Sequence, residues 1–157
     1  MTGNQVEKNV EVAASSRAID KEIVDFIGNN NIATVCCVVN NMPHCFNCFY
    51  SVLEGEPYII FKSSEGSKHM QILTENNQVA GTIISSEISL SKVQGMQFDG
   101  VIVDKDSSKL KAAKSYYLRY PFAVAMAGKL QILEFHSIKY TNTTNGIKRK
   151  KEWEQVK

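Results

Sequence analysis

The stretch "IATVCCVVNNMPHCFNCFYSVL", residues 32–53, decides the fold. Its first part, "IATVCCVV" (32–39), is continuously apolar and rich in β-branched residues, which predicts a strand buried on both faces. The following "NNMP" is typical of a turn. "HCFNCFYSVL" (44–53) then predicts a second strand. The stretch therefore predicts two strands joined by a short turn.

The same alternation of strands and turns continues along the chain. "EGEP" predicts a turn before a third strand, "YIIFK". Further strands are predicted at 78–85, 89–104 and 130–142, and helices at 19–28, 66–76 and 107–120. Six strands with short connections and a few outer helices predict a mainly β protein with flanking helices, built as a small closed barrel.

Length and composition limit the class of protein. A chain of 157 residues suits one domain, and we expect a loose polar arm at 1–14 followed by a single domain at 15–157. The net charge of +2, from 18 basic and 16 acidic residues, does not demand a nucleic-acid partner. We expect a cytoplasmic protein, because no apolar run could cross a bilayer and the start lacks a signal-peptide core.

The four cysteines predict no metal site. Cys45 and Cys48 form a CxxC pattern, but positions i and i+3 of a strand point to opposite faces. The adjacent Cys36 and Cys37 have the same problem, so we expect buried, inert cysteines rather than the alternative, a zinc site. The histidines and serines show no ligand or triad spacing, and no catalytic residue is predicted. If the protein is an enzyme, a cofactor carries the chemistry.

The stretch "FKSSEGSKHMQIL" (61–73) predicts a strand end that runs into a helix, with Lys68 in the first helical turn. A cation is disfavoured there unless it meets an anion. The hydroxyls of Ser63 and Ser67, the amines of Lys62 and Lys68 and the backbone N–H groups could together hold a phosphate. The alternative is a solvated helix start with an incidental lysine.

Two further features leave alternatives open. The second strand has one apolar face and one mixed face, the latter carrying Cys45, Asn47 and Phe49. A mixed face suits a flat amphipathic ligand, or else an ordinary half-exposed strand. The basic run Lys148–Lys151 is typical of a solvated face, and the alternative is a nucleic-acid or phosphate contact.

The order of these pieces resembles the flavin-binding split-barrel family typified by pyridoxamine 5′-phosphate oxidase, and looks closest to an uncharacterised bacterial subfamily. The resemblance rests on "NCFY", "SSEGSKHMQI", "NNQVAGTI", "GMQFDG", "YPFA" and "IKYTNTTNGIKRKKEW". It implies a six-stranded antiparallel split barrel that forms a homodimer, with FMN at the subunit interface. No arginine-rich substrate site can be matched, so no substrate is predicted.

The resemblance also assigns residues to the cofactor. The flavin ring would lie along Asn47, Cys48 and Phe49, and Gln94 or Gln97 would reach it from the other subunit. The phosphate would be held by Lys62, Ser63, Ser67 and Lys68, with His69 as a second basic contact. The function expected is an FMN-dependent oxidoreductase that takes electrons from a reduced nicotinamide to a small acceptor. The alternative is a flavin- or haem-binding carrier or sensor without turnover.

Overall fold

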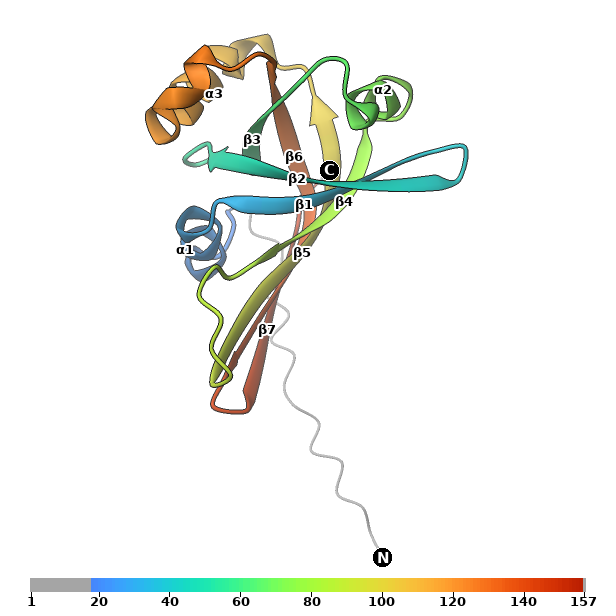
Figure 1. The fold of residues 1–157 in the computed structure, drawn as a ribbon. Helices are drawn as coiled ribbons and strands as arrows, with labels where there is room; N and C mark the ends of the chain where they lie inside the picture. Colours follow the sequence, from blue (N-terminus) through green and yellow to red (C-terminus); the bar gives the residue numbers. More distant parts are fainter. Residues whose placement is uncertain (1–17, 157) are drawn as a thin grey trace, which may run out of the picture.

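A computed structural model describes residues 18–156 of the protein and shows a seven-stranded antiparallel sheet with helices outside it (Figure 1). The predicted arm at 1–14 lies outside the described residues. The strands are β1 (Ile32–Val39), β2 (Met42–Val52), β3 (Tyr58–Ser63), β4 (Gln78–Ile84), β5 (Lys92–Val103), β6 (Lys129–Thr144) and β7 (Ile147–Glu154). The helices are α1 (Lys21–Asn29), α2 (Lys68–Glu75), α3 (Asp106–Arg119) and the 3-10 helix η1 (Pro121–Ala125).

The sheet curls into an uneven ring. Its strand order is β3-β2-β1-β4-β5-β6-β7, and an added pairing of β3 with β6 joins the two sides. The pairing lengths differ widely, because β5 pairs with β6 along its whole length whereas β2 meets β3 only over Tyr50–Val52. The observed architecture is thus a mainly antiparallel, split-barrel-like sheet and not an evenly closed barrel.

The sheet has one strand more than the six predicted. The basic tail forms β7, which pairs with Ser137–Thr144 of β6. The turn between them is Asn145-Gly146, with φ of 50° and 77°. Asn-Gly is a strong signal for a two-residue hairpin turn, since both central residues need positive φ. This dipeptide in the sequence predicts the hairpin, but the charge run that follows it obscures the strand.

The prediction that 32–39 is buried on both faces was wrong. Burial alternates along β1, with Ala33, Val35 and Cys37 inside and Ile32 and Thr34 outside. In an antiparallel sheet one face packs on the core and the other can meet solvent. The apolar outward residues of β1 therefore belong to a surface, which matters for the site below.

The helices cover different parts of the sheet. The side chain of Asp20 caps α1 by accepting a hydrogen bond from the Glu22 N–H at 2.8 Å. Lys151 of β7 lies 2.9 Å from carboxylate oxygens of both Asp20 and Glu22, which ties the tail strand to this helix. The α3 and η1 segments lie together against β2, β3 and β6 (Figure 1).

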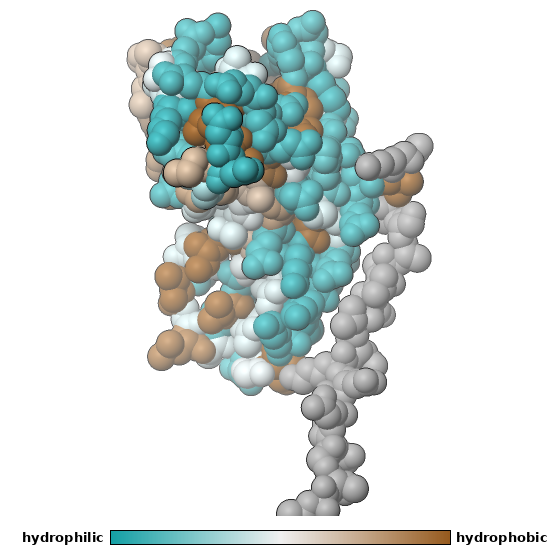
Figure 2. Space-filling model, turned by 90° about the vertical axis from the view of Figure 1, so that its right-hand side faces the viewer, coloured by the Kyte–Doolittle hydropathy of each residue, from teal (hydrophilic) through white to brown (hydrophobic). Residues whose placement is uncertain are grey.

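Two groups of exposed apolar side chains stand out in the described part of the chain. One lies at the lower end of the molecule as Figure 2 shows it, around the β4–β5 connection. Its members are Ile84, Ile88, Leu90 and Val93. The other surrounds a cavity at η1, described next. No helix within residues 18–156 is long and apolar enough to span a membrane.

Candidate functional site

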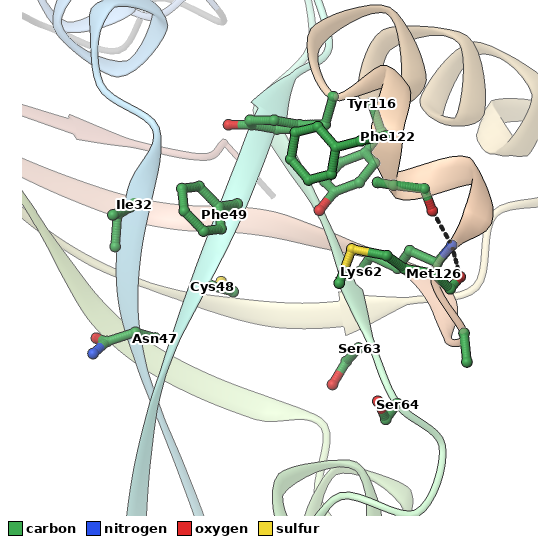
Figure 3. A pocket seen from close by; sticks show the side chains of 13 residues that line it. Ile32, Asn47, Cys48, Phe49, Lys62, Ser63, Ser64, Tyr116, Phe122 and Met126 are labelled. Carbon is green, nitrogen blue, oxygen red and sulfur yellow. Dashed lines mark hydrogen bonds between the residues drawn. The ribbon is translucent and has the colours of Figure 1, made fainter.

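A cavity of about 310 Å³ lies between β2, β3 and the segment formed by α3 and η1 (Figure 3). Its lining combines apolar and aromatic side chains with a few polar groups, the usual character of a ligand site. The residues that line it are Ile32, Asn47, Cys48, Phe49, Lys62, Ser63, Ser64, Tyr116, Tyr120, Phe122, Ala123, Met126 and Ala127. Five of the predicted cofactor residues are among them, namely Asn47, Cys48, Phe49, Lys62 and Ser63.

The β2 side of the cavity offers one polar and one aromatic group. The Oδ1 atom of Asn47 accepts a hydrogen bond from the Thr34 hydroxyl at 2.8 Å. This bond leaves the Asn47 amide N–H₂ free to donate to a ligand. Phe49 is 51% exposed and packs against the edge of Tyr120, with ring centroids 5.8 Å apart. A flat ligand could therefore lie on Phe49 with its polar edge toward Asn47.

The two cysteines of β2 differ in exposure, and the expectation that the cysteines are buried was wrong for Cys45. Cys48 is buried, whereas Cys45 is exposed, so the prediction that they occupy opposite faces is confirmed. Burial raises the pKa of the Cys48 thiol to about 12, and burial likewise raises the pKa values of Tyr116 and Tyr120. These groups stay protonated at neutral pH. They therefore offer no general base at that pH.

Lys62 is engaged with the opposite wall. Its ammonium donates to the carbonyl oxygens of Ala123 at 2.7 Å and Met126 at 2.6 Å (Figure 3). It therefore joins the end of β3 to η1 and holds Met126 over the cavity. Of the two lysines predicted to hold a phosphate, this one already has partners.

Three of the predicted phosphate residues converge at the start of α2. The Nε2 atom of His69 forms a short hydrogen bond with the Ser63 hydroxyl and lies 3.1 Å from the Ser67 hydroxyl. The two hydroxyl oxygens are 3.4 Å apart. Burial, with a smaller effect from His44, lowers the pKa of His69. At neutral pH the cluster is therefore uncharged.

The first turn of α2 is left open toward an anion. Its N-cap residue, Ser67, makes no side-chain capping bond, and the turn has no acidic residue. Lys68 is exposed and has no ion-pair partner within residues 18–156. Glu65, the acidic residue nearest to this turn in the sequence, is paired with Lys129 at 2.5 Å. Bare N–H groups and an unpaired lysine at one helix start make an anion-binding arrangement.

The two glutamines of β5 lie elsewhere in the chain. The amide of Gln94 donates to the Tyr140 hydroxyl at 2.7 Å, and Gln97 is exposed. Neither lines the cavity of its own chain. Their predicted contact with a ligand in another subunit stays a prediction.

The sequence interpretation missed the α3 and η1 side of the cavity. Tyr116, Tyr120, Phe122 and Met126 all line it. The sequence does contain a signal, because Pro121 ends the helix and starts η1, which turns the aromatic residues on either side of it toward β2. The pairing of this segment with β2 and β3 cannot be read from local pattern.

The arrangement defines a class of protein, those with a split-barrel-like fold and a cavity beside the barrel. A solved heme-binding protein from Mycobacterium smegmatis has a similar fold, with a TM-score of 0.70 at 16% identity, covering 92% of this chain. This chain covers 60% of that protein, less than two thirds of its length. A FAD-binding protein from Mesorhizobium loti gives a TM-score of 0.64 at 11% identity, covering 78% of this chain and 94% of that one. At these identities the likeness shows the fold alone.

In sequence, the chain is similar to a UPF0306 protein from Photorhabdus laumondii. The two are 28% identical over 131 residues, which is 83% of this chain and 92% of that protein. No family model matches the sequence. The narrower resemblance to pyridoxamine 5′-phosphate oxidase stays a prediction.

Proposed function

We propose that the protein binds FMN at the corner where β2, β3 and α2 meet, and that it serves as an FMN-dependent oxidoreductase. The isoalloxazine ring would lie in the cavity along Asn47, Cys48 and Phe49. The phosphate would meet the start of α2. The observation that carries the proposal is the uncapped helix start next to this cavity, with Lys68 beside it and without an ion-pair partner among residues 18–156.

The charges fit a phosphate ester. A phosphate monoester carries about 1.5 to 2 negative charges near neutral pH. The helix start contributes partial positive charge from its free N–H groups, and Lys68 adds a full charge. The hydroxyls of Ser63 and Ser67 supply further donors, and the Lys129 ammonium offsets the charge of Glu65. A dianion would therefore relieve the unfavourable placement of Lys68.

The chain's own residues would bind and shield the ring. The amide of Asn47 can donate to a ring carbonyl, and Phe49 and Tyr120 supply aromatic surface. Lys62 holds η1 so that Phe122 and Met126 lie at the mouth of the cavity. Bound FMN would supply the redox chemistry, accepting electrons from a reduced nicotinamide and passing them to a small acceptor.

A second subunit would complete the cover. Four apolar residues at the mouth remain exposed within the described part of the chain: Ile32 (46%), Phe49 (51%), Phe122 (67%) and Met126 (58%). Contiguous apolar surface of this kind suits a contact with another protein surface. We infer a homodimer in which these residues lie between the subunits.

The second candidate is a flavin- or haem-binding module without turnover. It is favoured by the absence of an acid or base poised near neutral pH among the described residues that line the cavity. The fold is shared with a heme-binding protein as well as a FAD-binding one. Haem is the poorer fit, because no histidine lines the cavity among the described residues and the Cys48 thiol stays protonated.

Titration of the purified protein with FMN, riboflavin and hemin tests the proposal. We expect saturable quenching of FMN fluorescence and clearly weaker binding of riboflavin, which lacks the phosphate. Equal affinity for FMN and riboflavin would contradict the phosphate site, and saturable hemin binding without FMN binding would favour the haem module.

Oxidation of NADH or NADPH by the FMN-loaded protein, with a quinone or nitro compound as acceptor, then separates an enzyme from a carrier. If the loaded protein oxidises NADH or NADPH no faster than free FMN does, the carrier is favoured.

A further inference from the structure

Two thiols face each other across β1 and β2. Cys36 lies directly opposite Cys45 in the strand register, and both are free. Residues directly opposite in an antiparallel pair project from the same face of the sheet. This is the outer face, because Cys36 is half-buried and Cys45 is exposed. Thr34 and Asn47, the next pair along the same face, already touch through a hydrogen bond of 2.8 Å.

The backbone hydrogen bonds place this cysteine pair in the closer of the two kinds of antiparallel pair. The N–H of Tyr50 donates to the carbonyl oxygen of Asn31 at 3.0 Å, so these two residues form a hydrogen-bonded pair. The two kinds alternate along a ladder, and the register runs without a shift to the hairpin turn. Cys36 and Cys45 lie five positions further along and thus form a non-hydrogen-bonded pair. Such pairs have Cα atoms about 4.5 Å apart, within the range of roughly 4.4–6.8 Å that disulfides span.

We propose that Cys36 and Cys45 are a site of reversible oxidation, forming a disulfide across the β1–β2 hairpin when the protein meets a low-molecular-weight disulfide. At this pair the outer face of the hairpin is open to a small oxidant, because Cys45 is exposed and Cys36 is only half-buried. Closing the bond asks the Cys36 thiol to give up a weak contact of 3.9 Å with the Cys37 carbonyl oxygen. At the Cα separation typical of such a pair, the bond can form without movement of the strands.

The exchange proceeds in two steps that balance. The thiolate of Cys45, the more exposed of the two, attacks one sulfur of oxidised glutathione, breaking its disulfide and releasing one glutathione thiolate. The Cys36 thiol loses its proton to solvent and attacks the Cys45 sulfur, releasing the second glutathione thiolate. Two protein thiols are oxidised to one disulfide, and one glutathione disulfide is reduced to two thiols. Excess reduced glutathione runs the same steps backward.

The other two cysteines do not compete. Cys37 and Cys48 point into the barrel and are only 1% and 8% exposed. Burial raises the pKa of both thiols, so little thiolate is present and the small oxidant cannot reach it. The pairing is therefore specific to the outer face.

The inference is independent of the proposed cofactor, because thiol exchange needs none. Its effect would nevertheless reach the candidate site. Cys45 is two residues from Asn47 on the same face of β2. The disulfide would therefore link β2, which carries the proposed ring contacts, covalently to β1.

Glutathione redox buffers test the proposal on the full chain. The protein is incubated at neutral pH over a series of ratios of oxidised to reduced glutathione. Its free thiols are then alkylated, and its mass is measured by mass spectrometry. Cys45, which faces Cys36 across the strands, raises the pKa of the Cys36 thiol. Thiol–disulfide exchange is therefore slow, and the incubation must be long. Cyanogen bromide cleaves after Met42 and separates Cys36 and Cys37 from Cys45 and Cys48. Fragments that stay joined until they are reduced mark a bond across the hairpin.

We expect the wild-type chain to lose two hydrogens in oxidising buffer and to regain them in reducing buffer, with its fragments joined in the oxidised state. Cys37→Ala, a control on the opposite face, should behave in the same way. Cys36→Ser and Cys45→Ser should form no joined fragments. Four free thiols throughout the series, a stable glutathione adduct on Cys45 that Cys36 does not displace, or joined fragments that persist in Cys36→Ser would each overturn the proposal.

Discussion

The imidazole ring of His69 stacks on the ring of Phe46, with centroids 3.8 Å apart and planes only 10° apart. This contact links the first turn of α2 to β2 and fixes the plane of the imidazole. The Nε2 edge is thereby directed at the hydroxyls of Ser63 and Ser67. The strand that carries the proposed ring contacts and the helix that carries the proposed phosphate contacts are thus joined through one histidine.

His69 should make the protein less stable in mild acid. Its pKa in the folded chain lies below the ordinary value of 6.5, so above that pH both folded and unfolded chains carry it neutral. As the pH falls through 6.5 the unfolded chain takes up the proton first, and the loss of stability is complete once the pH is below the lowered folded value. We expect the urea midpoint, followed by Trp153 fluorescence, to fall more from pH 7.5 to 5 in the wild type than in His69→Gln. Equal falls would show that His69 does not titrate abnormally.

Lys68→Glu should weaken FMN binding while leaving the fold intact. The change replaces the unpaired cation beside the helix start by an anion, and hydrogen bonds to charged groups contribute about 1.5–3 kcal/mol. We expect the Kd for FMN to rise about 10- to 100-fold or more, measured by fluorescence titration. Lys111→Glu makes the same charge change on the exposed face of α3 and should leave the Kd unaltered. If both variants bind like the wild type, the phosphate is held elsewhere.

Lys62→Met should destabilise η1 and the cavity together. The change removes two hydrogen bonds from an ammonium to the Ala123 and Met126 carbonyls, and we expect the free energy of unfolding to fall by about 1–3 kcal/mol. Lys129→Met is the control, since its ion pair with Glu65 is exposed and worth under about 1 kcal/mol. Urea unfolding measures both. A Lys62→Met chain as stable as Lys129→Met would mean that Lys62 does not anchor η1.

The sequence predicts the local elements of this fold better than their associations. Turn residues and hydrophobic pattern place the strands of the β1–β2 hairpin and the helix that ends before Pro121. The alternation of burial in β1 is hidden because its outward residues, Ile32 among them, are also apolar. Likewise the partners of Lys62 are Ala123 in η1 and Met126 just after it, more than sixty positions along the chain. No local pattern encodes such a contact. The helix-start cluster was accessible because Ser63, Ser67 and His69 are close in sequence.

Gly100→Ala should test the irregular pairing of β5 with β6. The register shifts next to Gly100, and a Cβ built there would lie 2.1 Å from the Glu134 carbonyl oxygen. Neither backbone can yield easily, so we expect a loss of about 1–3 kcal/mol or more in the free energy of unfolding. Gly95→Ala on the same strand is the control, because its Cβ would lie 3.8 Å from the nearest atom, in ordinary contact. Similar stability of the two variants would contradict the close approach at Gly100.

Subunit mixing should reveal whether one flavin site takes residues from two chains. Gln97 is the better candidate for the partner's contribution, because the amide of Gln94 is already bonded to Tyr140. We expect Lys68→Glu and Gln97→Ala each to bind FMN poorly alone, since every site in either homodimer contains a substituted residue. In a mixed dimer one site takes Lys68 from the Gln97→Ala chain and Gln97 from the Lys68→Glu chain, and is intact.

Random mixing of the two variants should therefore restore about a quarter of the wild-type FMN capacity, because half of the dimers are mixed and one of their two sites is whole. Capacity is measured by equilibrium dialysis after the chains are unfolded together and refolded. A site built within one chain gives no recovery on mixing, because each chain then carries its own substitution.

Dilution offers a separate check. If the site spans two subunits, flavin should leave as the dimer dissociates, and a flavin-loaded monomer seen by light scattering would contradict the shared site.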